Sequence, residues 1–206
     1  MKIITSKNKI FTMDVEKDIH SAYSFSKLLE KYGLRGEFYI CGYLVEKYPN
    51  ICYKISKNHV VGGHGFYHEN FAKLNYKNAF RIIRDTMQVF KDNEINMMGW
   101  RFPGLSFTYD SLKILADMGI YDSSFRLPAM KRWGKFYFLR TWAKNIFFSH
   151  SFSLPRPYPA NLVEKPFTVV DIENEIFYMY NGRIITHCYN YPNFEKEIKK
   201  YLNNYF

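Results

Sequence analysis

Two histidines, His64 and His68, stand four residues apart in "VVGGHGFYHENF", directly after a small apolar run that two glycines close. At this spacing two imidazoles share one side of a single helical turn and can hold one metal ion. A catalytic metal site usually has a third protein ligand and an open position for water, and a carboxylate is a common third ligand. The histidine pair therefore predicts an acidic side chain at another strand end.

Acidic residues cluster in "FTMDVEKD", where Asp14, Glu16 and Asp18 follow a short apolar run. Their position at the end of a predicted strand suits metal ligation or proton transfer. For Glu16 and Asp18 a structural explanation is also available, because acids near the start of a helix are favoured by the helix dipole. The sequence leaves the choice between these two acids open at this point.

Alternating strands and helices position these residues. The predicted helices, each with apolar residues at helical spacing, cover residues 20–32, 43–50 (ended by Pro49), 76–93, 109–119 and 193–206. The predicted strands are "KIFTMDV", "EFYICG", "HVVGG", "INMMGWRFPG", "IYDSS", "FTVVDIE" and "RIITHCY". Such alternation predicts a parallel α/β architecture, either a barrel or an open sheet.

A parallel α/β fold gathers the carboxyl ends of its strands at one rim. Four strand ends would then bring together one set of side chains: Asp14, Glu16, His64, His68, Arg101 and His187. A metal held by two histidines and a carboxylate lowers the pKa of its water, and a second carboxylate can take the proton. An arginine can hold that carboxylate by bidentate hydrogen bonds, and a further histidine can protonate a leaving group. The set predicts hydrolysis of an amide or an ester.

Each residue also has a structural interpretation when taken alone. Asp14 could cap a turn, Arg101 could pair with a surface acid, and His187 could be a hydrogen-bonded core histidine. Trp100, beside Arg101, is expected to pack inside the fold rather than to bind a sugar. The functional interpretation rests on the convergence of all these residues at one rim.

The composition of the 206 residues fits a single folded domain over residues 1–206, with an irregular insertion at about 123–166. The formal charge of +10 favours an anionic partner, but no helix-turn-helix, zinc-finger or RNP pattern is present, so nucleic acid is not the expected partner. Three cysteines without CxxC spacing argue against a disulfide framework. The first residues lack the features of a secretory signal, which predicts a cytoplasmic protein.

The segment 131–148, "KRWGKFYFLRTWAKNIFF", interleaves aromatic and cationic residues. This composition suits peripheral contact with an anionic lipid headgroup layer, and we hypothesise contact with the inner membrane face and access to a lipid-linked sugar phosphate. An insertion folded over the barrel, with its lysines in water, explains the same composition.

Five motifs in order, "TMDVE", "GGHGFYH", "RFPG", "YDSS" and "THCYN", resemble the polysaccharide deacetylase family, the NodB-homology group of carbohydrate esterases. The segments "LRGEFYICGYLVEKYPN" and "SLKILADMGIYDSSF" are also similar to that family. The resemblance extends from about Phe11 to Tyr191. It implies a distorted, incomplete (β/α) barrel that binds one divalent metal ion, usually zinc although cobalt, nickel or manganese can serve.

The resemblance also implies a role for each residue of the set. Asp14 matches the catalytic base, His64 and His68 the metal-binding histidines, Arg101 the arginine that holds the base, and His187 the general acid. Asp122 matches an acidic residue that tunes this histidine.

The chain departs from the family at two positions. The common first motif has two adjacent aspartates, whereas Val15 follows Asp14 here, so Glu16 becomes the expected third ligand and Asp18 the fallback. Cys188 stands where many members have a small apolar residue or a proline.

The resemblance implies an enzyme that removes an N-acyl group, typically acetyl, from an amino sugar during assembly of a surface polysaccharide or glycolipid. Two alternatives are an amidohydrolase acting on a small cyclic ureide and a glycan-binding module that has lost catalysis. The second would be favoured if Glu16 did not ligate the metal, because a metal held by two histidines alone binds weakly.

Overall fold

The computed structural model describes residues 10–124 continuously, the backbone of residues 126–127, 167–172, 175–180 and 183–187, and the single positions 195, 196, 199 and 203. The segment 131–148, with its hypothesis of membrane contact, lies outside the described residues. No helix in the described part of the chain is long and apolar enough to span a bilayer.

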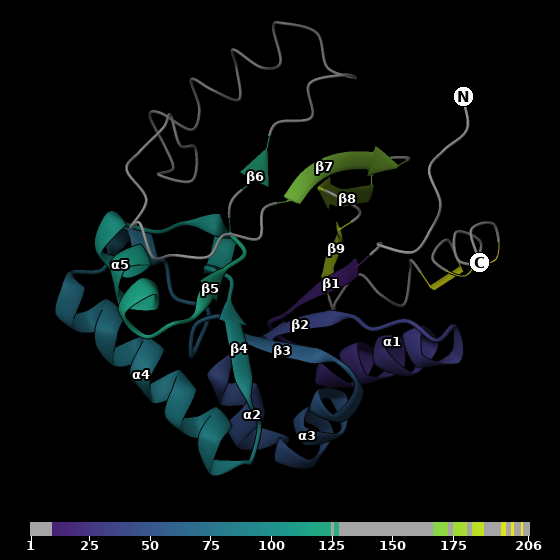
Figure 1. The fold of residues 1–206 in the computed structure, drawn as a ribbon, viewed down its shortest axis with the longest axis horizontal. Helices are drawn as coiled ribbons and strands as arrows, with labels where there is room; N and C mark the ends of the chain where they lie inside the picture. The colour runs from purple at the N-terminus through teal and green to yellow at the C-terminus, as the bar shows by residue number, and fades with distance from the viewer. Residues whose placement is uncertain are drawn as a thin grey trace, which may run out of the picture.

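The amino-terminal half alternates strands and helices as the sequence predicts (Figure 1). The strands are β1 (Ile10–Val15), β2 (Glu37–Ile40), β3 (Val60–Gly63), β4 (Met97–Trp100) and β5 (Tyr121–Asp122). The helices between them are α1 (Ile19–Lys31), α2 (Gly42–Lys47), α3 (Pro49–Asn58), α4 (Tyr76–Asp92) and α5 (Tyr109–Asp117), with short 3₁₀ turns at Phe71–Lys73 and Pro103–Leu105.

Helix α3 was not predicted from the sequence. Pro49 was predicted to end the preceding helix, but α2 already ends at Lys47 and Pro49 is the first residue of α3. Proline is favoured at this position because the first helical residue has no intrahelical use for its N–H group. Helix α3 then buries Cys52 and Ile55 in the core.

The described strands form one row in the order β5-β4-β3-β2-β1-β9-β8-β7-β6, and among these strands the row is not closed into a ring. Strands β1 to β5 are parallel, and β9 (Arg183–His187) adds to β1 in parallel. The predicted incomplete barrel is confirmed, because the row ends at β5 on one side and at β6 on the other.

The carboxyl-terminal strands depart from the predicted parallel pattern. Strand β8 (Glu175–Tyr180) was not predicted, and it pairs antiparallel with both β7 (Phe167–Ile172) and β9. The short β6 (Arg126–Leu127), also not predicted, pairs in parallel with β7. Only two positions of the sequence separate β7 from β8, too few for a parallel crossover, which needs a dozen or more residues.

Alternation along β1 gives the sheet two different faces. Met13 and Val15 lie fully buried in the apolar cluster that helices α1, α2 and α3 share with the sheet. The intervening Thr12 and Asp14 lie on the opposite face, where both contact Arg101. Successive side chains of a strand point to opposite faces, so one strand supports the core and carries polar site residues.

A second apolar cluster lies under α4 and α5 and includes Trp100, which is fully buried and packs edge-on against Phe71 and Phe102. This confirms the expected packing role of Trp100. Gly63 on the neighbouring strand makes room for it, because a Cβ at Gly63 would lie 2.4 Å from the indole ring.

The predicted terminal helix over 193–206 is described only in part. Residues 195, 196, 199 and 203 are helical, and the other positions of that range lie outside the described residues. The Tyr32 hydroxyl at the end of α1 donates a hydrogen bond to Asn203 Oδ1 at 2.6 Å.

Candidate active site

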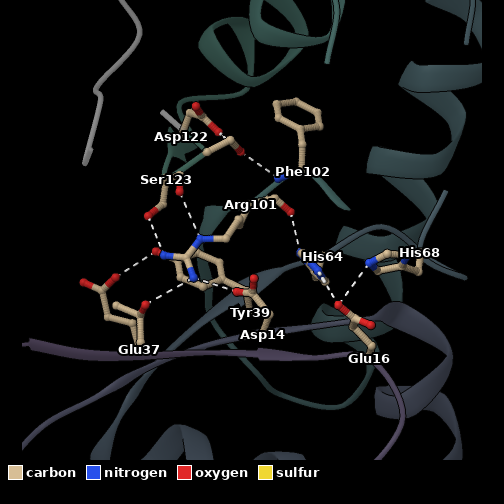
Figure 2. Close-up of polar contacts among 12 residues, drawn as sticks. Asp14, Glu16, Glu37, Tyr39, His64, His68, Arg101, Phe102, Asp122 and Ser123 are labelled. Atoms are coloured by element: carbon tan, nitrogen blue, oxygen red, sulfur yellow. Dashed lines mark hydrogen bonds and ion pairs between the residues drawn. The ribbon is translucent and has the colours of Figure 1, made fainter. Parts of the chain in front are cut away.

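Three side chains from two loops form a group with metal-ligand geometry: Glu16, His64 and His68. One ligand atom from each lies within 4.8 Å of the other two. Glu16 Oε1 is 3.1 Å from His68 Nε2 and 3.8 Å from His64 Nε2, and Figure 2 shows both rings turned toward this carboxylate. In the described part of the chain, this is the group whose donor atoms could surround a single cation.

His64 has the surroundings of a metal ligand. Its Nδ1 lies 2.8 Å from the carbonyl oxygen of Arg101, so this nitrogen carries the proton and Nε2 carries the lone pair. Nε2 is buried and has no hydrogen-bond partner among the described residues, since Glu16 Oε1 at 3.8 Å is too far. Metal-binding histidines usually donate their second N–H to a carbonyl or carboxylate in this way. The donor set therefore fits a divalent metal ion.

The two histidines do not share a helical turn, contrary to the sequence prediction. Residues 64–68 form a loop after β3 in which Gly65 has φ +75° and His68 has φ +66°. Glu69 holds this loop, because its carboxylate accepts hydrogen bonds from two successive backbone N–H groups, those of Phe66 and Tyr67. The imidazole rings nevertheless lie close, with centroids 5.1 Å apart. Loop geometry, not helical spacing, brings them together.

Asp18, the alternative third ligand, has a different structural role. Its Oδ1 accepts hydrogen bonds at 3.1 Å from the backbone N–H groups of His20 and Ser21, and its Oδ2 accepts one at 2.5 Å from the Ser21 hydroxyl. Asp18 is thus the N-cap of α1. The structure places Glu16, and not Asp18, beside the histidines.

A buried ion pair lies next to this group. Arg101 Nη1 donates to Asp14 Oδ1 at 2.6 Å, the arginine is 0% exposed and the aspartate 5%. The same nitrogen is 3.2 Å from Thr12 Oγ1. The sequence predicted a bidentate contact with the carboxylate, but Nε and Nη2 donate at 2.9 Å to the carbonyl and hydroxyl oxygens of Ser123. Strand β1 and the segment directly after β5 therefore fix the guanidinium (Figure 2).

Sequence reasoning missed the residues that surround the guanidinium. The Arg101 Cζ lies 4.0 Å from the centroid of the Tyr39 ring, whose hydroxyl donates to Glu37 Oε2 at 2.7 Å. Both residues are buried. They lie on β2 at alternate positions, which is the signal that could have found them, since polar residues inside a strand buried on both faces need polar partners.

Asp122 and His187 had been assigned a joint role. Asp122, at the end of β5, is fully buried and accepts a 2.7 Å hydrogen bond from the Ser124 hydroxyl, which in turn accepts from the backbone N–H of Phe102. His187 is the last residue of β9 and the register partner of Asp14. The backbone of His187 therefore lies at the same strand ends as the ion pair.

The charges of the group reinforce one another. Burial alone would raise the pKa of Glu16, but its interactions with the two imidazoles outweigh burial and lower the pKa well below its usual range. The contact with Glu16 raises the pKa of His68. Burial disfavours the charged form of Arg101, yet the charge of Asp14 more than compensates and raises the pKa of the guanidinium. The Asp14 carboxylate is thus held by Arg101, and the Glu16 carboxylate by the nearby His68 imidazole.

The family follows from a match to the polysaccharide deacetylase model over residues 11–122, more than half of the chain. The chain belongs to the polysaccharide deacetylase family. A peptidoglycan-N-acetylglucosamine deacetylase of Bacillus cereus is 31% identical over 88 residues, which cover 41% of this chain and 29% of that protein. The matched part of this relative is therefore less than a third of its length.

Solved structures share the fold. A family 4 carbohydrate esterase of Streptomyces lividans in complex with acetate superposes with a TM-score of 0.54 at 17% identity, covering 59% of this chain and 65% of that one. A family 4 pseudoenzyme of Bacillus anthracis superposes with a TM-score of 0.55 at 17% identity, covering 79% and 56%. At these identities the likeness concerns the fold, which therefore accommodates both an esterase and a pseudoenzyme.

Proposed function

We propose that this deacetylase-family chain is a metal-dependent hydrolase that removes an N-acetyl group from an amino sugar of a surface glycan or glycolipid. The observation that carries the proposal is the placement of Glu16, His64 and His68 within ligand distance of one another, beside the buried pair of Arg101 and Asp14. Family membership and the name of the Bacillus cereus relative support the amide of an N-acetylated sugar as the scissile bond.

Glu16, His64 and His68 would hold the metal through one carboxylate oxygen and the two Nε2 atoms. A divalent ion held there, with zinc the expected one, supplies a Lewis acid that polarises the acyl carbonyl and activates water. The N–H···O=C contact to Arg101 keeps the His64 lone pair directed at the site.

Asp14 is assigned the role of general base. Its carboxylate oxygen Oδ1 already accepts a hydrogen bond from Arg101, which keeps the group ionised and fixes its orientation. His187 is assigned the role of general acid that protonates the departing amine, on the basis of its motif and of its backbone position opposite Asp14.

The placement of Glu16 also bears on the alternative of a catalytically inactive glycan-binding module. That alternative gains support if the chain lacks a third protein ligand, because two histidines alone bind a metal weakly. Glu16 lies beside both histidines despite the valine in the preceding position, which favours the hydrolase. No contact in the described residues favours a cyclic ureide.

The test is to measure metal content by plasma mass spectrometry, together with acetate release from N-acetylchitotetraose. We expect about one divalent ion per chain in the wild type and loss of both metal and activity in Glu16→Ala. The matched control is Asp18→Asn, which alters an acid two residues away that caps α1 and should retain both. Equal metal content in Glu16→Ala and wild type would contradict the assigned ligand, and an empty wild type after incubation with zinc, cobalt, nickel and manganese would contradict the hydrolase.

A further inference from the structure

An exposed pair of stacked tyrosines borders the metal-ligand group. The Tyr67 ring lies 5.7 Å from the Tyr43 ring with an interplanar angle of 24°, and Phe66 packs edge-on against Tyr67 at 4.8 Å. Tyr67 is 68% exposed, the largest value among the exposed large apolar side chains of the described residues. One face of the Tyr67 ring therefore rests on Tyr43 while much of the side chain remains in contact with solvent.

The backbone holds this aromatic pair in place. Both carboxylate oxygens of Glu69 accept hydrogen bonds in this loop, at 2.8 Å from the N–H of Phe66 and at 2.9 Å from that of Tyr67. From the other side, the N–H of Tyr43 donates to the carbonyl oxygen of Phe66 at 3.1 Å. A side chain that is ordered before a ligand arrives loses little conformational entropy on binding, so this loop is preorganised.

The stacked pair of Tyr43 and Tyr67 is connected to the proposed metal ligands through the chain and through a hydrogen bond. Tyr67 directly precedes His68 in the chain. The Tyr43 hydroxyl donates a hydrogen bond to the backbone carbonyl of Glu16. The aromatic pair is therefore next to two of the three proposed ligands, to His68 through the chain and to Glu16 through a hydrogen bond.

We propose that Tyr67, supported by Tyr43, is a stacking subsite for a pyranose ring of the glycan that the enzyme deacetylates. This inference rests on the proposed function, which it deepens by assigning a residue that positions the sugar. A pyranose presents a face of C–H groups that packs on an aromatic ring, while its hydroxyls need polar partners such as a tyrosine hydroxyl. The exposed ring of Tyr67 offers the apolar surface, and the partners for the sugar hydroxyls lie elsewhere in the site.

Binding and catalysis are tested separately in Tyr67→Ser, Tyr67→Phe and Tyr76→Ser. Tyr67→Phe retains the ring. Tyr76→Ser is the matched control, because Tyr76 on α4 is also exposed and stacked, in its case on Phe80. Calorimetric titration of the full chain with N-acetylchitotetraose in EDTA measures binding without turnover. Acetate release from the same oligomer and from 4-nitrophenyl acetate, with the metal-loaded full chain, measures catalysis.

We expect Tyr67→Ser to weaken binding of the oligomer about tenfold and to raise KM by a similar factor. The kcat on 4-nitrophenyl acetate, the metal content and the Tm should stay at their wild-type values, and Tyr67→Phe and Tyr76→Ser should bind within about twofold of wild type. Unchanged oligomer binding in Tyr67→Ser, or no binding by the wild type at millimolar oligomer, overturns the subsite. Tyr67-dependent binding without acetate release by any form would support the subsite and contradict the proposed hydrolysis, so the two failures are distinguishable.

Discussion

The buried pair of Arg101 and Asp14 allows one energetic prediction to be developed in detail. At 2.6 Å between Nη1 and Oδ1, and with an effective dielectric constant of about 20, the gross Coulomb attraction is about 6 kcal/mol. Taking two ions out of water costs several kcal/mol each, so the net contribution of the pair to stability is small. Removing only one partner leaves a buried charge without compensation, which costs about 3–5 kcal/mol.

The perturbation is therefore a double-mutant cycle with Asp14→Asn, Arg101→Met and the double variant. We expect each single variant to lose about 3–5 kcal/mol of unfolding free energy and the double variant to lose about as much as one single variant. The coupling energy between the two positions should then equal the loss of one single variant, about 3–5 kcal/mol.

The assay is equilibrium unfolding in urea at neutral pH, followed by circular dichroism and fluorescence so that two-state behaviour is checked. If the losses of the two single variants add to within about 0.5 kcal/mol in the double variant, the two charges do not depend on each other and the reasoning is refuted. A variant too unstable to purify can be compared in a background of moderate osmolyte, because the coupling energy is a difference between variants.

Four further predictions concern single residues. Asp18→Ala should lower the unfolding free energy by about 1 kcal/mol because the α1 cap is lost, while Asp18→Asn should lower it less. Burial would raise the pKa of Asp18, but hydrogen bonds from Ser21 outweigh burial and lower this pKa, so the carboxylate contributes stability above pH about 3.9 that is lost as pH falls through the lower folded pKa. Urea unfolding measured from pH 2 to 5 should show this contribution of Asp18 in the wild type and not in the variants. Burial lowers the pKa of His59, so stability should decrease as pH falls below about 6.5, with a shallower slope in His59→Gln between pH 5 and 6.5. Burial raises the pKa of the Cys52 thiol to about 12, and this thiol should react with a disulfide reagent only after unfolding, which a time course with and without urea would check. Val15→Asp should destabilise the chain by several kcal/mol without raising metal content, as measured by urea unfolding and plasma mass spectrometry, because it places a charge in the apolar cluster.

The parallel half of the fold was predictable because its signals are local. Helices α1, α4 and α5 have apolar residues at helical spacing. Each is followed within two residues by a backbone position with positive φ, at Gly33, Glu94 and Gly119. Strand β8 was not predicted, although the sequence carries a signal for it: "EIFYMY" is rich in β-favouring residues and Asn181-Gly182, a dipeptide typical of hairpin turns, follows it. Helix α3 was missed because a proline can either follow a helix or begin one.

The site was predictable in its residue types but not in its contacts. Motif order named Asp14, Arg101 and the histidines, yet the polar support of Arg101 comes from Ser123 and from strand β2, far away in sequence. The i, i+4 spacing of the histidines suggested a helical turn, whereas the loop at Gly65 and His68 uses positive φ angles that no helical pattern encodes. Contacts of this kind depend on tertiary structure, which spacing rules do not contain.

The alternation of strand β1 explains why Glu16 stands beside the histidines. Asp14 contacts Arg101 on the polar face of the sheet, and Val15 turns to the opposite face, where it is fully buried in the apolar cluster. The next residue, Glu16, follows the end of the strand and lies beside His64 and His68. A side chain one methylene longer than aspartate, placed one residue later, thus brings a carboxylate to the histidines while the intervening position serves the core. The valine after Asp14 is therefore compatible with the grouping of Glu16 with the two histidines.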